Sequence, residues 1–341
     1  MRFLLLILGG LTLGAAAHLA QVSDEGWLPL GPQAEGHVAA LAVNERGRLY
    51  AGTQDGELYT RTDDSWRATA REARLVAHPI TALLPGEPFF IGTTQGLYTL
   101  DGNQAAPVAA LPALAVRELI RDGAGGVLLA EVQGDIYHAA AGEAWRRVPR
   151  AGLPDGVPVY RLLVHGGRLH AGTVGAGVYT LGDDEPWTPL GTGLPEDTKV
   201  FALWPLTERG LVAGTDAGAW RLDEGGQWRR LGVGLDRQRV LDLTTYREGN
   251  TDVLLAASDE ALWRLPVDQP DAWWQATDTL VPLAKPVARV VVSDGEPYLA
   301  AGPVYGWAVS RSDRLGVALL GGTGMVLIIL ALWLGGRQRR R

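Results

Sequence analysis

A short motif recurs seven times along the chain at a nearly constant spacing. It reads Ala51-Gly52-Thr53 where it first occurs, and its middle residues are Gly52, Gly92, Glu131, Gly172, Gly214, Ala257 and Ala301. The steps between these residues are 40, 39, 41, 42, 43 and 44. A repeat of this length indicates the blades of a β-propeller, each of which is a small sheet that packs against its neighbours. We therefore expect seven similar units in series.

Each unit predicts four antiparallel strands, and the fourth unit shows them most clearly. Residues 159–164 form an apolar strand pattern, a turn follows at His165-Gly166-Gly167, and residues 168–173 form the next strand. A second glycine-rich turn leads to a third strand at residues 178–181, and a short fourth strand opens at Trp187. The 45 glycines and 20 prolines fit many short strands and tight turns better than helices. The sequence therefore predicts an all-β fold.

A tryptophan marks the outermost strand of most units. These residues are Trp66, Trp145, Trp187, Trp228 and Trp273 or Trp274, and Pro107-Val108 takes this place in the second unit. The seventh unit lacks such a strand at its own end, but residues 26–31 match residues 186–191 almost one for one. We therefore predict that this segment pairs near residues 304–309. The predicted fold is a seven-bladed β-propeller over residues 18–314, closed by an N-terminal strand that removes exposed sheet edges.

The N-terminus has the three parts of a secretory signal peptide. Arg2 supplies the positive charge, an apolar run extends from Phe3 to Leu13, and Ala15-Ala16-Ala17 forms a small-residue cleavage site. The sequence therefore predicts a signal peptide over residues 1–17. An uncleaved signal anchor is the alternative interpretation of the same run.

A second apolar segment, residues 315–336, contains 22 residues without a charge. At about 1.5 Å per residue it is long enough for a transmembrane helix. The basic tail at residues 337–341 is typical of the cytoplasmic side. We therefore expect a single-pass protein of the bacterial cell membrane with its propeller on the extracytoplasmic side. Because Gly321-Gly322 precedes much of the apolar run, a sorting signal that is cut and re-anchored remains the alternative.

Charge and composition exclude several classes of function. Once Arg2 and the four arginines of the tail are set aside, the formal net charge of −7 becomes −12 for residues 18–314. Such an acidic body argues against binding to nucleic acid. The chain has no cysteine, which excludes disulfides, zinc–thiolate sites and cysteine nucleophiles. The six histidines show no metal-ligand spacing, so no metal or cofactor is expected.

The repeats resemble two neighbouring families of propeller. The order Gly-Thr, turn, Gly-x-Tyr-Thr, turn and Trp is similar to the degenerate Asp-box repeats of sialidase-like and photosystem II assembly-factor-like propellers. The segments Gly152-Leu153-Pro154-Asp155 and Gly193-Leu194-Pro195-Glu196 resemble repeats in the sensor propellers of two-component regulators. The resemblance covers about residues 22 to 310 and implies a fold rather than one activity. The nearest Asp-box segments, residues 62–66 and 223–228, lack parts of the full pattern.

Charged residues occupy one shared position of the predicted innermost strands. When the strands are aligned at their first apolar residue, the residues two places further on are Ala40, Ala82, Glu118, Arg161, Ala202, Asp242 and Arg289. Two acids and two arginines should therefore lie at the axis, where an unpaired buried charge is costly. They form either a solvated salt-bridge ring or a site for a small polar ligand or a partner loop. The candidate binding residues are Glu118, Arg161, Asp242 and Arg289.

The sequence shows no catalytic constellation. A sialidase needs three arginines on one carboxylate, a tyrosine nucleophile and acidic residues, and no arginine motif of that family occurs near the N-terminus. We therefore expect a membrane-anchored, non-enzymatic scaffold that binds an as yet unknown protein partner or membrane complex. A sialidase-like glycan hydrolase or a carbohydrate-binding propeller is one alternative. A ligand-sensing propeller that relays to a membrane partner is another.

Overall fold

The computed structural model describes residues 25–309, apart from 33, 35, 63–64, 70–74, 183–184, 207–209, 260, 273 and 278–282. These residues form strands, turns and loops. Within this part of the chain, no helix has the length and apolar character needed to cross a bilayer. The predicted signal peptide at residues 1–17, transmembrane helix at residues 315–336 and basic tail at residues 337–341 lie outside the described residues.

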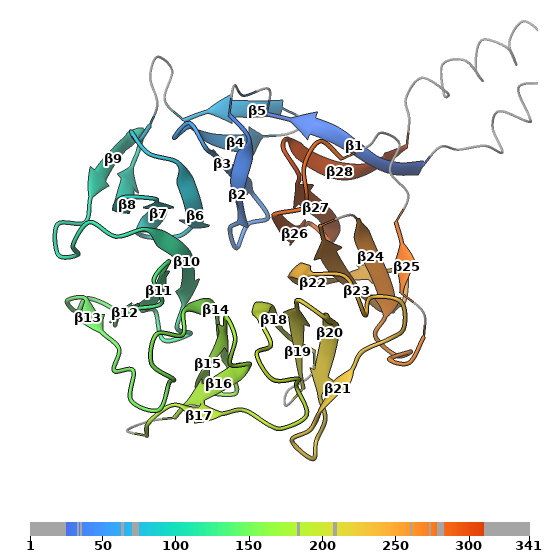
Figure 1. Ribbon diagram of the computed structural model, residues 1–341. Helices are drawn as coiled ribbons and strands as arrows, with labels where there is room; N and C mark the ends of the chain where they lie inside the picture. Colours follow the sequence, from blue (N-terminus) through green and yellow to red (C-terminus); the bar gives the residue numbers. More distant parts are fainter. Residues whose placement is uncertain are drawn as a thin grey trace, which may run out of the picture. The chain divides into compact units, whose positions relative to one another are not determined.

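Seven four-stranded sheets surround a central axis (Figure 1). The innermost strands are β2 (Val38–Val43), β6 (Ile80–Leu84), β10 (Val116–Arg121), β14 (Val159–His165), β18 (Val200–Pro205), β22 (Val240–Glu248) and β26 (Arg289–Ser293). The second strands are β3 (Leu49–Thr53), β7 (Phe89–Thr93), β11 (Val127–Glu131), β15 (Arg168–Thr173), β19 (Leu211–Thr215), β23 (Thr251–Ser258) and β27 (Glu296–Ala300). The third strands are β4 (Leu58–Thr62), β8 (Gly96–Asp101), β12 (Ile136–Ala139), β16 (Val178–Leu181), β20 (Gly218–Leu222), β24 (Leu262–Pro266) and β28 (Val304–Val309). The outermost strands are β5 (Ser65–Ala68), β9 (Gln104–Pro107), β13 (Arg146–Arg147), β17 (Thr188–Pro189), β21 (Trp228–Arg230), β25 (Gln275–Ala276) and β1 (Glu25–Gly31).

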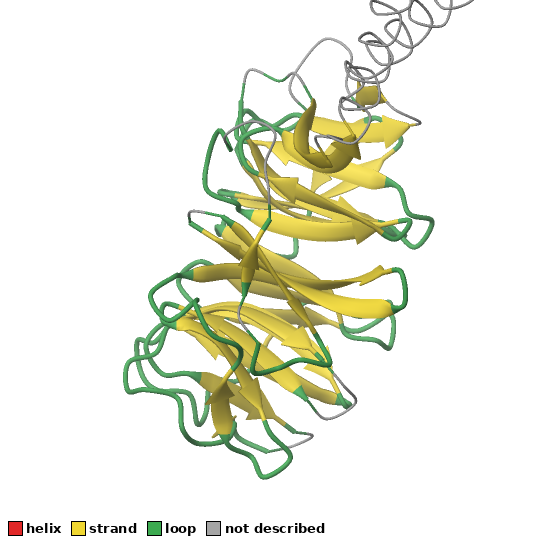
Figure 2. Ribbon diagram, turned by 90° about the vertical axis from the view of Figure 1, so that its right-hand side faces the viewer, coloured by secondary structure: helices red, strands yellow, loops and turns green. Residues whose placement is uncertain are grey.

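The strand order confirms the seven-bladed β-propeller predicted from the repeat. Six sheets use four consecutive strands, in orders such as β14-β15-β16-β17, whereas the seventh has the order β1-β28-β27-β26. A side view shows that loops join the strands at both ends of the blades (Figure 2). In the seventh sheet, a Cβ added at Gly306 of β28 would lie 2.5 Å from the Cδ1 atom of Leu30 in β1. The first described strand therefore lies directly beside the last.

The recurring Gly-Thr motif lies where one blade packs against the next. A Cβ added at Gly172 would lie 2.7 Å from a methyl group of Val200, the first residue of the next inner strand. Thr173 donates from its hydroxyl to the carbonyl of Gly177 at 2.8 Å and so stabilises the following turn. The same close approach of the next blade occurs at Gly52, Gly92 and Gly214. In these four blades glycine recurs because a larger residue would separate neighbouring blades, whereas alanine takes the equivalent place in the others, as Ala130 does opposite Glu118.

Replacing Gly172 with alanine is expected to lower the free energy of unfolding by about 1–3 kcal/mol, because the added methyl group overpacks this contact. Urea denaturation would measure the change. Gly225→Ala is the matched control, since Gly225 is exposed and has ordinary backbone angles. Equal effects of the two substitutions would contradict this explanation of the motif.

Three of the tryptophans at the outermost strands connect their blade to the preceding one. The indole N–H of Trp187 donates to the carbonyl of Pro149 at 3.0 Å, and that of Trp228 donates to Leu190 at 2.6 Å. Trp274 makes the equivalent bond, to the carbonyl of Leu231 at 2.7 Å. These tryptophans are only 2–4% exposed. Their spacing in the sequence therefore reflects a repeated contact between blades.

Candidate functional site at the propeller axis

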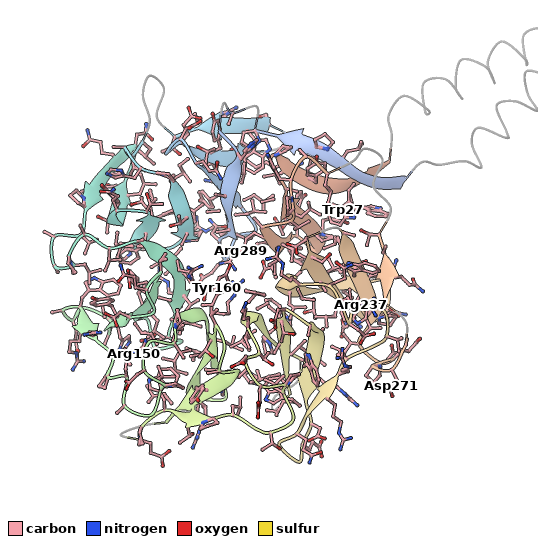
Figure 3. The ribbon with its side chains drawn as sticks, viewed as in Figure 1. Trp27, Arg150, Tyr160, Arg237, Asp271 and Arg289 are labelled. Atoms are coloured by element: carbon pink, nitrogen blue, oxygen red, sulfur yellow. The ribbon has the colours of Figure 1, made fainter. Side chains whose placement is uncertain are left out.

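Four charged side chains from four blades meet at the axis. Nη1 of Arg161 lies 2.7 Å from Oε1 of Glu118, and its Nη2 lies 3.1 Å from Oδ1 of Asp242. Arg289 lies 3.6 Å from the same two oxygens. Figure 3 shows Arg289 near the centre of the ring of blades. The structure therefore brings together all four residues identified from the alignment of the inner strands, and we call them the axial ring.

Arg161 is the central cation of the axial ring and donates hydrogen bonds from all three of its side-chain nitrogen atoms. Besides its two carboxylate partners, Nε donates to the carbonyl of Phe201 at 3.0 Å and Nη2 donates to that of Leu241 at 3.3 Å. Its side chain is only 11% exposed. A planar guanidinium with five N–H groups suits such multiple contacts. Arg161 therefore links inner strands of several blades and has little capacity left for a ligand.

The two acids of the axial ring are also held by the backbone. The N–H of Leu162 donates to Oε2 of Glu118 at 2.6 Å, and the N–H of Val290 donates to Oδ2 of Asp242 at 2.9 Å. In each bond the donor lies on the blade that follows the blade of the acid. Charge-assisted hydrogen bonds of this kind are stronger than neutral ones. The acids therefore have fixed positions.

Burial opposes the charged forms of both Arg161 and Asp242. For Arg161 the attraction of Glu118 and Asp242 outweighs burial, so its pKa lies above the ordinary value and the side chain stays charged. For Asp242 burial is the larger effect, in spite of Arg161 and the Val290 N–H, and it raises the pKa of Asp242 to about 6. Asp242 is thus a weaker acid in the folded protein than in the unfolded chain.

This shift predicts that Asp242 makes stability depend on pH. Because the folded state holds this proton more tightly, the free energy of unfolding should fall as the pH rises from about 4 through about 6. Other acids, such as Asp122 with its lowered pKa, act in the opposite direction. The difference between the native protein and Asp242→Asn isolates the effect. Urea denaturation at pH 5 and at pH 7 would measure the free energy of unfolding of both proteins. Between pH 5 and pH 7 the native protein should lose more of this free energy than the variant, and equal losses would contradict the prediction.

A cavity of about 380 Å³ opens at the axial ring. Arg289, Arg161 and Glu118 contribute to its wall, together with residues one place earlier on the inner strands. These neighbours of the ring positions are Ala39, Thr81, Arg117, Tyr160, Leu241 and Ala288. In six inner strands the pairing register shifts between the first and the third residue, as between Val159 and Arg161. A β-bulge therefore allows two successive residues to line one cavity.

The wall of this cavity is uneven because the residues that directly precede the ring positions differ in size. The guanidinium of Arg117 lies 4.3 Å from the centre of the Tyr160 ring, and Tyr160 in turn packs edge to face on Phe201 at 5.3 Å. Small residues, Ala39 and Ala288, occupy the same position in the first and seventh blades. The cavity therefore has a basic and aromatic side and a small, apolar side.

The alignment of inner strands selected the third position and did not select Arg117 or Tyr160. In a regular strand, successive side chains point to opposite faces, so residues next to the ring positions would face the blades. The signal that could have identified them is their occurrence at one shared position, directly before Glu118 and Arg161. The bulge itself has no clear sequence mark in these strands.

Arg289 is the member of the axial ring that is most available to a ligand. Its contacts to both acids are 3.6 Å long, and its side chain makes no hydrogen bond to any residue that the structure describes. Its side chain is 26% exposed. Among the described residues, no group of three or more His, Asp or Glu side chains could hold a metal ion. The chemistry offered by this site is therefore that of an arginine in a small cavity.

Comparison with solved structures shows proteins of the same fold. The extracellular domain of a putative one component system from B. thetaiotaomicron matches with a TM-score of 0.70 and 16% identity, over 83% of this chain and 39% of that chain. A structure of YCF48 bound to D1 peptide matches with a TM-score of 0.62 and 16% identity, over 84% and 97% of the two chains. Virginiamycin B lyase from Staphylococcus aureus matches with a TM-score of 0.66 and 9% identity, over 84% and 99%.

These similarities confirm the resemblance to sensor and assembly-factor propellers at the level of the fold. The present chain spans about two fifths of the length of the B. thetaiotaomicron protein. No protein-family model and no curated protein matches the sequence. Because one propeller fold carries many activities, the function has to be argued from the axial site.

Proposed function

We propose that this protein is a non-enzymatic binding propeller, which recognises a partner protein at the axial mouth. The observation that carries this proposal is the contrast within the axial ring. Glu118, Arg161 and Asp242 hold one another in fixed positions, whereas Arg289 lines a cavity of about 380 Å³ and its side chain has no hydrogen bond within the described chain. A donor held in place but still free to bind suits recognition, because little has to be reorganised on binding.

The proposed location is the extracytoplasmic side of the cell membrane, with the propeller anchored by residues 315–336. The predicted signal peptide and the apolar C-terminal segment support this location. Two of the similar propellers are consistent with it, since one is the extracellular domain of a putative one component system and another binds a peptide. A partner protein or a membrane complex is therefore the proposed target.

We also propose that the N-terminal strand β1 closes the ring and keeps the axial site rigid. The support is the order β1-β28 in the seventh sheet and the burial of Trp27, which is 1% exposed. Pairing with β1 covers the outer edge of β28, and β1 then takes the outermost place that β5, β9 and the equivalent strands have in the other blades. The inner strand β26, which carries Arg289, belongs to this same sheet.

Crosslinking and affinity capture of the tagged protein from its native membrane would test the proposed function. We expect a specific partner to be captured by the native protein and lost with Arg289→Ala. Arg146→Ala is the matched control, because Arg146 is an exposed arginine of the outermost strand β13. A partner retained equally by both variants would remove the axial mouth as the binding site.

A further inference from the structure

Three polar groups of the axial cavity lack the partners that such groups usually have. Arg289 has only its two 3.6 Å contacts, and the buried Nε of Arg117 has no hydrogen-bond partner. The hydroxyl of Tyr160 forms no hydrogen bond to a described residue. All three side chains line the same cavity. Figure 3 shows Tyr160 and Arg289 both close to the axis. A buried group such as Nε of Arg117 normally has a hydrogen-bond partner, and its position beside two further available donors indicates a place for a ligand.

The charge of the site selects an anion. Arg117, Arg161 and Arg289 face the cavity, and the acids in contact with them are Glu118 and Asp242. One positive charge is therefore not balanced when both acids are ionised. This excess lies within a body whose formal net charge is −12 once Arg2 and the arginines of the tail are set aside. A single negative charge on a ligand would complete the balance.

The shape and lining of the cavity limit what carries that charge. About 380 Å³ is at the small end of the range for ligand sites. Val116, Val132 and Pro286 give part of the wall an apolar character, and Val132 is 38% exposed. A doubly charged phosphate would face Glu118 at close range, whereas a carboxylate carries one charge at neutral pH. The flat pair of carboxylate oxygens also matches the N–H groups of an arginine.

We infer that the axial cavity binds a carboxylate that is attached to an apolar group, with Arg289, Arg117 and the Tyr160 hydroxyl as its donors. This inference rests on the proposed function, because it names the chemical group that a partner or ligand presents at the same mouth. The carboxylate belongs either to the free C-terminus of a peptide or to a small organic acid. Arg161 is not assigned as a donor, since four of its five N–H groups already donate to the protein.

Equilibrium binding to the purified full-length chain tests this inference with defined probes. N-acetyl-Leu-Phe with a free carboxylate is expected to bind about tenfold or more tightly than the same peptide with a C-terminal amide, because the amide loses the charge-assisted bonds. Phenylacetate serves as a small acid without a peptide, and inorganic phosphate serves as a doubly charged anion. If phenylacetate binds as tightly as the peptide acid, the carboxylate that the cavity recognises is that of a small organic acid. If only the peptide acid binds, the carboxylate that the cavity recognises is the C-terminus of a peptide.

Variants then assign the donors. Arg289→Gln and Arg117→Gln should each weaken binding of the peptide acid about tenfold or more, and Tyr160→Phe should weaken it several-fold while keeping the ring. Arg230→Gln is the matched control, because Arg230 also stacks on an aromatic ring, at 4.9 Å from the centre of Trp220, but lies outside the cavity. The thermal midpoint of each variant shows that it is folded.

Equal affinities for the acid and the amide, tighter binding of phosphate, or unchanged binding in both arginine variants would overturn the inference. The capture experiment separates this failure from that of the proposed function. If membrane capture still depends on Arg289 while the peptide acid and amide bind equally, the axial mouth remains the partner site and only the carboxylate is wrong.

Discussion

Replacing Arg161 with methionine is expected to lower the free energy of unfolding by about 3–5 kcal/mol at pH 7, the effect of breaking a buried ion pair from one side. The variant leaves Glu118 and Asp242, whose side chains are 5% and 8% exposed, without their main cation. Because methionine keeps much of the side-chain volume, the loss of stability reflects the missing charge more than missing packing contacts. Chemical denaturation followed by tryptophan fluorescence would measure it.

Two further variants show whether charge is the cause. Arg289→Met should lower the free energy of unfolding by only about 1 kcal/mol or less, because its contacts are long and its side chain is 26% exposed. Adding Glu118→Gln and Asp242→Asn to Arg161→Met should restore much of the lost stability, since no buried charge then stays unpaired. A variant Arg161→Met as stable as Arg289→Met would show that the axial ring is not held by this arginine.

Replacing Trp27 with alanine is expected to lower the free energy of unfolding by about 3–5 kcal/mol, the usual result of removing a buried tryptophan. Trp27 lies on β1, is 1% exposed and packs edge to face on Trp307 at 5.8 Å. If β1 closes the ring, its loss should also expose the edge of β28 and cause association of the protein. Denaturation and size-exclusion chromatography would measure the two effects.

Trp307→Ala is the matched control for this prediction. It removes the other ring of the same aromatic pair, but Trp307 is 41% exposed, so we expect a loss of about 1 kcal/mol. If Trp307→Ala lowers the free energy of unfolding more than Trp27→Ala does, and the Trp27→Ala protein stays monomeric, β1 is not needed for the ring.

The blade architecture could be predicted from the sequence because its main contacts repeat. Gly172 touches Val200 of the next blade, and Trp187 donates to Pro149 of the preceding one, so the same residue types return in most blades. Because the inner strands also repeat, their alignment placed Glu118 and Arg289 at the same strand position. Periodic contacts produce a periodic sequence, which a single chain displays without any relatives.

The details of the cavity could not be predicted, because they depend on a departure from regular strand geometry. The β-bulge before Glu118 and Arg161 brings Arg117 and Tyr160 to the axis, although a regular strand would point them elsewhere. The sequence also does not show which of the two arginines has short contacts to both acids, because this depends on distances in the folded protein. Arg161 and Arg289 are equivalent in the alignment, yet their contacts to the acids are 2.7–3.1 Å and 3.6 Å respectively.

Segments far apart in the sequence meet at one axis, and a double-mutant cycle on Arg161 and Asp242 tests this meeting most directly. These residues are 81 positions apart in the sequence, on β14 and β22, and are joined by a contact of 3.1 Å. Unfolding free energies of the native protein, Arg161→Met, Asp242→Asn and the double variant at pH 7 should give a coupling of about 2 kcal/mol or more. Additive effects within about 0.5 kcal/mol would contradict the axial ring, and with it the binding site built on it.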